Sequence, residues 1–549
     1  MKTDATAMMT DAVPNVASVK MRASAKFSSY ATPLPARVPT MMVDVDRRMS
    51  AVGGWGSVMA SYTTQVPALT ERPLWPWNLV ATVVCAVTLL VAYAHLVAPS
   101  YSYLGYTWAA PNYALLGLAI AELGALSLLL PTRLRKPSDF MLLVIFATVV
   151  IPVLTIGNVI GLLTTAQIAL LCFFTGAAFA IAALMARWGH GHLTVRLPRV
   201  PARWYWAGVG AFIAATILVL VAVGGVRLDV PGLTEVYDLR DDYKVGLAAF
   251  PPLAYMVPAA CYVAIPLVII RGLHRRAWLP VAVGIACQGF VYLQTGFKTF
   301  LFAIPVLLVL TVLIRRTFPT ALVPAGLAAG VVAAGILDVA LDSVWFSSLF
   351  TRRFLATPGQ LAANYVSFFD EHRFVLLSEG PLRGLVPYPY DMPVPFVIGR
   401  EIHGVTTNSS NVNLFGDGFA QAGWPGMLIA GVLFGALLIL VDLASKGLPP
   451  SVGYMLMFLP CIVLGNASIL TAMLSHGLAA AVVLLALAPR EGWEPLLEPR
   501  LRSGATRRAS KGSTIGEDGQ EFGGEPRQRV MLGDPGDAGG APALPFVLR

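Results

Sequence analysis

The chain has 549 residues, of which 56% are hydrophobic and only 13% are charged. A soluble domain carries about 25% charged residues, so this composition argues against a soluble enzyme and favours a membrane protein. The net charge of +9 does not require a nucleic-acid partner, because many of the basic residues lie in short loops and tails, where they anchor membrane proteins to the cytoplasmic side.

The five cysteines all fall inside apolar runs. They form no CxxC motif and have no metal-ligand spacing, so we interpret them as small core residues and expect no metal site. These residues are Cys85, Cys172, Cys261, Cys287 and Cys461.

Two polar tails flank the apolar part of the chain. Residues 1–72 are rich in Ala, Ser, Thr, Pro and Met, and they contain no apolar run long enough for a signal peptide. Residues 490–549 are rich in Gly, Pro, Arg and Glu. Segments of this composition bury too little apolar surface to fold. We therefore predict two disordered cytoplasmic tails around one membrane domain, residues 73–489.

The region between the tails is predicted to form about twelve transmembrane helices. Repeated apolar runs of about 20 residues have the length that crosses a bilayer. The fold class is therefore an all-α polytopic membrane protein, in which the last two spans are short. The expected spans are residues 75–97, 107–130, 139–160, 164–186, 204–224, 247–270, 277–293, 299–314, 319–340, 421–444, 451–468 and 470–488.

The charge of the connections predicts their orientation. Lys and Arg concentrate in cytoplasmic loops, and here the basic connections alternate with the others along the chain. The basic connections are residues 132–136, 187–203, 271–276, 315–316 and Lys446. Both termini are therefore expected in the cytoplasm. A large loop, residues 341–420 between spans nine and ten, is expected on the outer side.

This large outer loop carries five arginines, two histidines and seven carboxylates. Cations are unusual on the outer side, so five arginines there predict an anionic partner. Guanidinium groups bind phosphate through two parallel hydrogen bonds. The arginines are Arg352, Arg353, Arg373, Arg383 and Arg400. The alternative is pairing with nearby carboxylates or snorkelling from a helix end. We favour that alternative for Arg383 and Arg400, and it stays open for Arg352.

Two smaller outer segments also carry charge. Residues 233–244 include Tyr237 and Arg240, and residues 294–299 form a turn that places Lys298 at the membrane boundary. Lys adds a mobile point charge to the bidentate grip of Arg. We expect both segments to bind the same phosphate-bearing substrate as the large loop.

The stretch 352–374 combines aromatic and titratable residues. Its spacing predicts a helix after Pro358, with Tyr365 on an aromatic-rich stretch ahead of Glu371 and His372. Aromatic faces stack on sugar rings, and a carboxylate or an imidazole can accept a hydroxyl proton. Amphipathic packing on the membrane surface is the alternative reading of this stretch.

A further polar segment, residues 406–426, precedes span ten. It contains Asn408, Asn411, Asn413 and Asp417. Asn side chains both donate and accept hydrogen bonds and therefore suit hydroxyl-rich ligands, while Asp417 is a third candidate base. Helix capping and turn formation are the alternative explanation for the asparagines.

The order of these motifs resembles a known family. A Lys-containing turn, GFKT, is followed by RRFLATPGQL and NYVSFF, and then by PVPFVIGREIHG and GDGFAQAGWPG running into a membrane helix. This pattern is similar to the oligosaccharide repeat-unit polymerases, the Wzy-type polymerases of O-antigen and exopolysaccharide, most specifically over residues 290–430. An Arg-x10-Gly spacing found in two outer loops of some members is matched by Arg373 and Gly384, but not in residues 225–246.

The resemblance implies a metal-independent glycosyltransferase without a cofactor in the bacterial inner membrane. Such an enzyme transfers a growing glycan from undecaprenyl pyrophosphate to the next lipid-linked repeat unit on the outer side. Arg240, Lys298, Arg353 and Arg373 would then hold the pyrophosphates. The implied partners are the polyprenyl-pyrophosphate-linked oligosaccharide, the bilayer, a flippase and a chain-length regulator.

Other classes remain as alternatives. An O-antigen ligase shares the donor and the topology but transfers glycan to lipid A core. A transporter would show charged or broken helices at mid-membrane, and Glu122 lies well inside a predicted span. An acyltransferase would use an in-membrane base such as His476, and an older type of lipid-to-sugar transferase would need an acidic pair that the first outer loop lacks.

Overall fold

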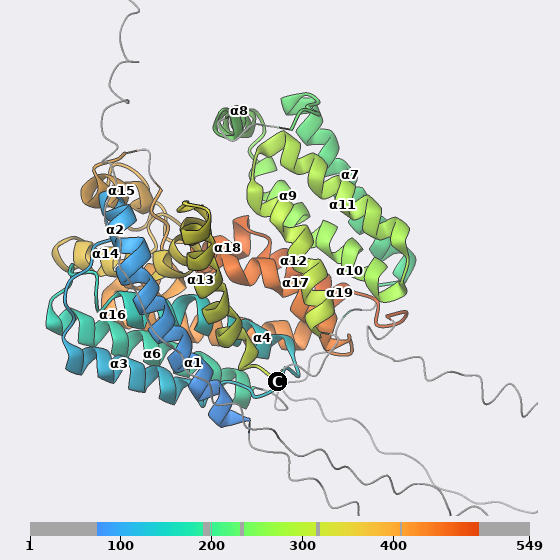
Figure 1. The fold of residues 1–549 in the computed structure, drawn as a ribbon. Helices are drawn as coiled ribbons and strands as arrows, with labels where there is room; N and C mark the ends of the chain where they lie inside the picture. Colours follow the sequence, from blue (N-terminus) through green and yellow to red (C-terminus); the bar gives the residue numbers. More distant parts are fainter. Residues whose placement is uncertain are drawn as a thin grey trace, which may run out of the picture. The chain divides into compact units, whose positions relative to one another are not determined.

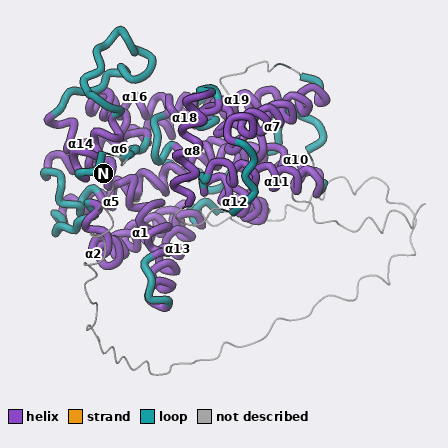
Figure 2. The backbone as a smooth tube through the Cα atoms, turned by 90° about the horizontal axis from the view of Figure 1, so that it is seen from above, coloured by secondary structure: helices purple, strands orange, loops and turns teal. Residues whose placement is uncertain are grey.

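The computed structural model describes residues 74–189, 198, 200–230, 235–314, 319–406 and 409–493. The regular structure of these residues is helical (Figure 1), and the view from above shows the helices together with several longer loops (Figure 2). The predicted all-α class is confirmed for this part of the chain. The predicted tails, residues 1–72 and 490–549, lie outside the described residues except for residues 490–493.

Fifteen α-helices longer than seven residues are joined by shorter α-helical, π-helical and 3-10 segments in the part of the chain described. In chain order the elements are α1 (Trp75–Ala92), η1 (Tyr93–Val97), α2 (Ala98–Tyr101), η2 (Ser102–Leu104), α3 (Tyr113–Ser127), α4 (Pro137–Ile145), η3 (Phe146–Val150), α5 (Ile151–Ile156), α6 (Thr165–Trp188), α7 (Ala202–Gly224), α8 (Glu235–Ala249), α9 (Leu253–Ala259), η4 (Ala260–Ala264), α10 (Ile265–Arg275), α11 (Trp278–Thr295), α12 (Lys298–Ile314), α13 (Leu322–Ala340), η5 (Ser347–Ala356), α14 (Thr357–Glu371), α15 (Val394–His403), α16 (Leu414–Ala444), α17 (Pro450–Val463), α18 (Ile469–Ser475) and α19 (Leu478–Leu487).

Seven helical runs within the described ranges are long and apolar enough to cross a membrane. They are Trp75–Leu104, Pro137–Ile156, Thr165–Trp188, Ala202–Gly224, Leu253–Arg275, Leu322–Ala340 and Leu414–Ala444. The pair α18 and α19, bent by 63°, would make an eighth. The protein is therefore polytopic by length and composition. The other predicted spans fall on helices too, among them the shorter apolar α3, α12 and α17, and the number twelve stays a prediction.

Helices α6 and α16 pack closely because small residues face each other. A Cβ atom added at Gly431 would lie 2.4 Å from the carbonyl oxygen of Ala178, and one at Gly435 would lie 2.7 Å from Sδ of Met185. Glycines four residues apart lie on the same helix face, and small residues at this spacing let helix backbones approach in membranes. The pair α6 and α16 thus forms a rigid support for the segment between α13 and α16.

The predicted outer loop 341–420 is largely helical. It folds into η5, α14 and α15, which confirms the helix predicted after Pro358. Pro358 to Val366 are all buried, as are Phe368 and Phe369, and α14 packs against α5 and α16. A Cβ atom at Gly359 would lie 2.4 Å from the carbonyl oxygen of Pro152. The alternative of an amphipathic stretch resting on the membrane surface is therefore wrong for α14 up to Phe369, because most of these residues are buried within the protein, whereas Asp370 and Glu371 are exposed.

Asn413 joins α14 to the start of α16. Its side chain accepts hydrogen bonds from the backbone N–H groups of Phe415 and Gly416, and its Nδ2 donates to the carbonyl oxygen of Pro358 at 3.1 Å. The residue is fully buried, so the two first-turn N–H groups of α16 depend on Asn413 for their partner. The alternative explanation of helix capping is confirmed for this asparagine.

We expect Asn413→Ala to destabilise the protein by about 2–3 kcal/mol, because it removes a cap and leaves buried polar groups unsatisfied. The matched control is Asn112→Ala, which removes the exposed N-cap of α3 and should cost only about 1 kcal/mol. Thermal unfolding midpoints of both variants in the same detergent measure the difference. Equal shifts would contradict the bridging role of Asn413.

Candidate functional site

Two neighbouring clefts lie between the chain that follows α14 and the first turns of α16, and the second cleft also borders the start of α18. The first, which we call the aromatic cleft, has a volume of about 810 Å³ and is lined by Phe369, Asp370, Glu371, His372, Arg373, Phe374, Leu376, Val386, Pro387, Tyr388, Pro389, Phe419, Gly423 and Trp424. The second, the acidic cleft, has a volume of about 780 Å³, and its polar lining includes Glu379, Arg383, Tyr388, Asp391, Asp417 and Gln421. Residues 386–388 line both clefts and form their shared wall.

A break in α16 shapes both clefts. Ala422 and Gly423 leave the helical conformation, and Gly423 has a φ of 63°, which glycine adopts most readily. A break of this kind leaves backbone carbonyls without helical partners. The carbonyl oxygen of Ala420 instead accepts from the N–H of Val375 at 2.9 Å. The chain after α14 is therefore attached to the interrupted helix.

Gln421 holds a strained turn at the same place. Leu376 and Leu377 both have positive φ values, 51° and 60°, a conformation that costs about 1–2 kcal/mol for a residue with a side chain. The N–H of Leu376 donates to the carbonyl oxygen of Gln421 at 3.1 Å, and that of Leu377 donates to its Oε1 at 2.8 Å. This turn separates Arg373 in one cleft from Glu379 in the other. Strain that is held in this way is common at functional sites.

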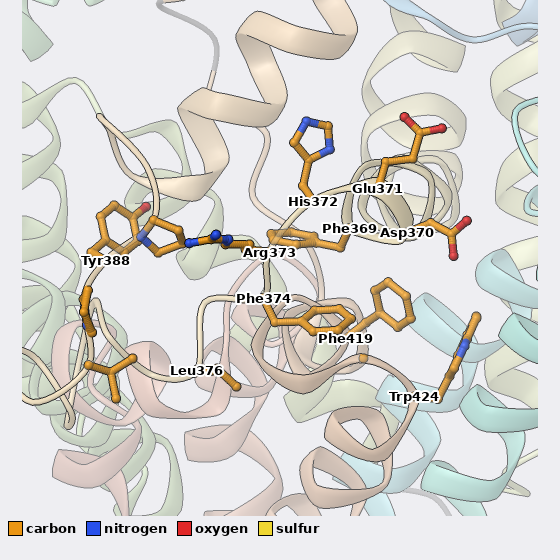
Figure 3. Close-up of a pocket in the computed structure, with 14 residues that line it drawn as sticks. Phe369, Asp370, Glu371, His372, Arg373, Phe374, Leu376, Tyr388, Phe419 and Trp424 are labelled. Carbon is orange, nitrogen blue, oxygen red and sulfur yellow. The ribbon is translucent and has the colours of Figure 1, made fainter.

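Aromatic rings line one side of the aromatic cleft. Phe374 lies nearly parallel to Phe369, with centroids 6.2 Å apart, and meets Phe419 edge-on at 6.0 Å. Phe419 in turn contacts Trp424 at 4.6 Å. Figure 3 shows the rings of Phe374, Phe419 and Trp424 on one side of the cleft, with His372 and Glu371 on the other. Such a surface can stack against the apolar face of a sugar ring.

His372 is oriented as a proton acceptor. Its Nδ1 lies 2.8 Å from the carbonyl oxygen of Phe368, so this nitrogen carries the proton and donates. Its ring stacks on Phe368 with centroids 4.0 Å apart and an interplanar angle of 7°. Because one nitrogen is committed and the ring is held by stacking, the exposed imidazole presents Nε2 as the acceptor.

Glu371 and Arg373 are exposed and make no hydrogen bond or ion pair through their side chains with other described residues. The backbone at Arg373 is nevertheless held, because the hydroxyl of Tyr390 donates to its carbonyl oxygen at 2.5 Å. In Figure 3 the Arg373 side chain extends towards Tyr388 in the shared wall. The aromatic cleft therefore contains two candidate bases, Glu371 and His372, and the guanidinium of Arg373, which is unpaired among the described residues. These three residues are consecutive in the sequence.

The acidic cleft is organised around Glu379. Its Oε1 accepts from the Tyr388 hydroxyl at 2.5 Å and from the N–H of Val394 at 3.2 Å. Burial, and secondly the hydrogen bond to Glu379, raises the pKa of Tyr388, so this hydroxyl stays protonated. Asp417 lies in the same cleft, 3.4 Å from Nε2 of Gln421. The cleft thus holds Glu379 and Asp417 near the Tyr388 hydroxyl, while its third carboxylate, Asp391, pairs with Arg400.

Arg383 and Arg400 were both expected to have structural roles, and the structure shows an ion pair only for Arg400 among the described residues. Arg400 pairs with Asp391 at 2.8 Å and with Glu401 at 2.9 Å, which confirms the structural role expected for it. Arg383 is exposed, lines the acidic cleft and has no ion pair with another described residue. The pairing expected for it is therefore contradicted, and snorkelling from a helix end, the other structural role expected for it, stays a prediction. The Arg-x10-Gly spacing ends at Gly384, which has a φ of 85° in the same cleft.

Arg352 and Arg353 lie on the π-helical turn η5. Arg352 donates to Oγ of Ser348 at 2.8 Å and stacks over the rings of Tyr101 and Tyr106, at 4.4 Å and 5.7 Å. Arg353 is exposed and makes no side-chain bond to another described residue. Neither arginine lines either cleft. Arg352 is therefore held by an aromatic cage, and Arg353 is the available cation of this turn.

Tyr365 and the asparagines do not line the clefts. Tyr365 is only 2% exposed, and its hydroxyl donates to the carbonyl oxygen of Ser410 at 3.0 Å, so the predicted stacking on a sugar is contradicted by burial. Asn411 is exposed and lies outside the lining of both clefts. Asn408 and the side chain of Tyr237 lie outside the described residues.

Arg240 and Lys298 are close to each other but not in the clefts. Arg240 donates from Nε to the carbonyl oxygen of Gly296 at 3.2 Å and lies 5.4 Å above the ring of Phe297. Lys298 is the first residue of α12. Helix α8 packs on α7 and α11, whereas α14 packs on α5 and α16. These two cations were predicted to share one site with the large loop. In the structure neither of them lines the clefts formed by that loop.

Several residues of the site escaped sequence reasoning. Glu379 and Tyr388 stand in an irregular stretch without a periodic pattern, and Trp424 was noted only as part of a motif. His403 lines neither cleft; it is half-buried, with Nε2 3.2 Å from Nδ2 of Asn364, and burial lowers its pKa. The positive φ of Gly423 could have been suspected from the adjacent Trp-Pro-Gly, which disfavours a continuous helix.

Within the described ranges no group of three His, Cys, Asp or Glu side chains could hold a metal ion. Comparison of the chain with protein-family models, with curated proteins and with solved structures finds no match.

We expect Gly423→Ala to distort the aromatic cleft. The added Cβ would combine the strain of a positive φ with a 3.0 Å approach to Cζ of Phe374. The control is Gly384→Ala, which has the same sign of φ but meets nothing within 4 Å. Both should cost about 1–2 kcal/mol from backbone strain, and Gly423→Ala should cost more. Thermal unfolding measures this, and a larger shift for Gly384→Ala would contradict the assignment.

Proposed function

We propose that this protein is a glycosyltransferase that polymerises lipid-linked oligosaccharide repeat units. One observation carries the proposal: two clefts with separate available arginines, Arg373 and Arg383, share a single wall. A polymerisation step needs two phosphate-bearing glycans held side by side. The aromatic rings and carboxylates around the arginines suit sugars, since aromatic faces and hydrogen-bonding side chains are what carbohydrate surfaces bind.

The proposed reaction is a substitution at the anomeric carbon of the donor glycan. A hydroxyl oxygen of the acceptor sugar forms the new bond, and the bond between the anomeric carbon and the pyrophosphate oxygen breaks. The proton of the hydroxyl passes to a base, with His372, Glu371 or Asp417 as candidates. The electron pair of the broken bond leaves with polyprenyl pyrophosphate, whose growing negative charge Arg373 stabilises.

The membrane helices provide the second line of support. Helix α16 starts within the acidic cleft and continues as one of the seven apolar runs that could cross a bilayer. A substrate whose lipid chain stays in the membrane would present its phosphates and sugars where such a helix begins. We place this site on the outer side of the bacterial inner membrane, with undecaprenyl pyrophosphate as the carrier and a flippase and chain-length regulator as partners.

We expect Arg373→Ala to reduce glycan polymerisation by roughly 10²–10³-fold, the cost of losing one donor to a developing anion. The matched control is Arg400→Ala, which removes another arginine of the same segment that is paired and lines neither cleft. The length distribution of the surface glycan measures the effect. Long chains at normal levels in Arg373→Ala would refute the leaving-group role.

Deletion of the gene separates a polymerase from the ligase alternative. Loss of a polymerase should leave single repeat units on their final acceptor, because no chain can grow. Loss of a ligase should leave long chains on the lipid carrier instead. Analysis of lipid-linked intermediates by mass spectrometry distinguishes the two, and the second pattern would overturn the proposal.

We expect a cysteine at Leu385, which is 80% exposed, to react with an impermeant thiol reagent in intact spheroplasts. A cysteine at Arg275, in a basic connection, should react only after the membrane is permeabilised. The parent protein supplies the background, since four of its five cysteines are buried. The reverse labelling pattern would invert the proposed topology.

A further inference from the structure

A third cavity lies at the other end of α16, where the helix stops at Ala444. This cavity, which we call the basic pocket, has a volume of about 340 Å³, within the range of small-ligand sites. It is lined by Arg135, Lys136, Pro137, Ala186, Gly189, Ile439, Asp442, Leu443, Ser445, Lys446, Gly447, Leu448 and Pro450. The lining comes from the start of α4, the end of α6 and the end of α16.

The one carboxylate that lines the basic pocket is already saturated. Asp442 pairs with Nζ of Lys136 at 3.0 Å, and it accepts from the N–H of Ser138 at 2.9 Å and from its hydroxyl at 2.7 Å. Nearby Asp139 is likewise committed, because it accepts from the backbone N–H groups of Arg135 and Lys136 at 2.9 Å and 3.2 Å. Neither carboxylate is left to neutralise a further cation.

Two cations of the basic pocket remain available. Arg135 and Lys446 are exposed and make no side-chain hydrogen bond or ion pair with another described residue. With Lys136 balanced by Asp442, the lining carries a surplus of two positive charges. The first turn of the run that begins at Pro137 adds the positive end of its helix dipole. The pocket therefore attracts an anion.

The position of the basic pocket indicates where that anion comes from. The pocket forms where three of the apolar runs end, namely Pro137–Ile156, Thr165–Trp188 and Leu414–Ala444. Trp188, next to the lining residue Gly189, is 78% exposed at the end of its run. Tryptophan prefers the level of the lipid head groups, and basic pockets between membrane helices bind anionic head groups.

We propose that the basic pocket binds the phosphate of an anionic phospholipid, with Arg135 and Lys446 as its ligands. This site is separate from the two clefts and does not depend on the proposed transferase reaction. The group that it binds is a phosphate oxyanion, which in the phospholipid is a singly charged phosphodiester. Inorganic phosphate would present similar oxygens to the pocket. The membrane-level position favours the lipid as the source.

The test compares lipid binding by the full chain and by Arg135→Gln/Lys446→Gln. Each basic residue near a membrane surface contributes about 1 kcal/mol to binding an anionic lipid, so the double variant should bind phosphatidylglycerol roughly 30-fold more weakly. The matched control is Arg275→Gln/Arg276→Gln, which removes two exposed cations at the end of α10 that do not line the pocket. Native mass spectrometry of retained phosphatidylglycerol gives the affinities.

A second measurement keeps the result interpretable if the variant is less stable. Unfolding midpoints are recorded in nanodiscs of phosphatidylcholine, with and without phosphatidylglycerol, and in phosphatidylcholine with added inorganic phosphate. The parent and the control should be stabilised by phosphatidylglycerol, and the double variant should not. Full stabilisation of the double variant would overturn the proposal. An equal, variant-sensitive shift with inorganic phosphate alone would overturn the lipid as the source.

Discussion

The interruption of α16 at Ala422 and Gly423 is the constraint on which the candidate site depends. An uninterrupted helix would keep the carbonyl of Ala420 within its own hydrogen-bond ladder, and Val375 would lose its partner. Because the helix breaks, its first turns serve as an attachment point for the chain that follows α14. The aromatic cleft and the acidic cleft lie on either side of that attachment, so both inherit their shape from one backbone feature.

The close packing beneath this break explains why it can persist. Gly431 and Gly435 bring α16 against α6 over the apolar stretch that follows the interruption, and α14 is buried against α5 and α16. Two consecutive left-handed leucines, Leu376 and Leu377, would relax in an unsupported loop. Here they are held by Gln421, which belongs to the same supported helix.

Apolar periodicity predicted most of the helices, including the one after Pro358, because long apolar runs leave the backbone few alternatives in a membrane. It did not predict that α14 is buried, since burial depends on partners distant in the sequence. Glu371, His372 and Arg373 were each predicted from the sequence, and they line one cleft because they are contiguous. Glu379 could not be linked to Asp417 in this way, because their cleft is created by the break in α16 and not by any local pattern.

The shared wall between the two clefts has a consequence for how ligands are received. Pro387 and Pro389 fix their own φ angles and restrict the residues before them, Val386 and Tyr388. A wall made of such residues has little conformational entropy to lose when a ligand binds, so the entropic cost of binding is small. It also keeps the two chambers at a constant separation. The clefts would then select glycans by their size and shape against a rigid wall. The wall would not rearrange to fit each glycan.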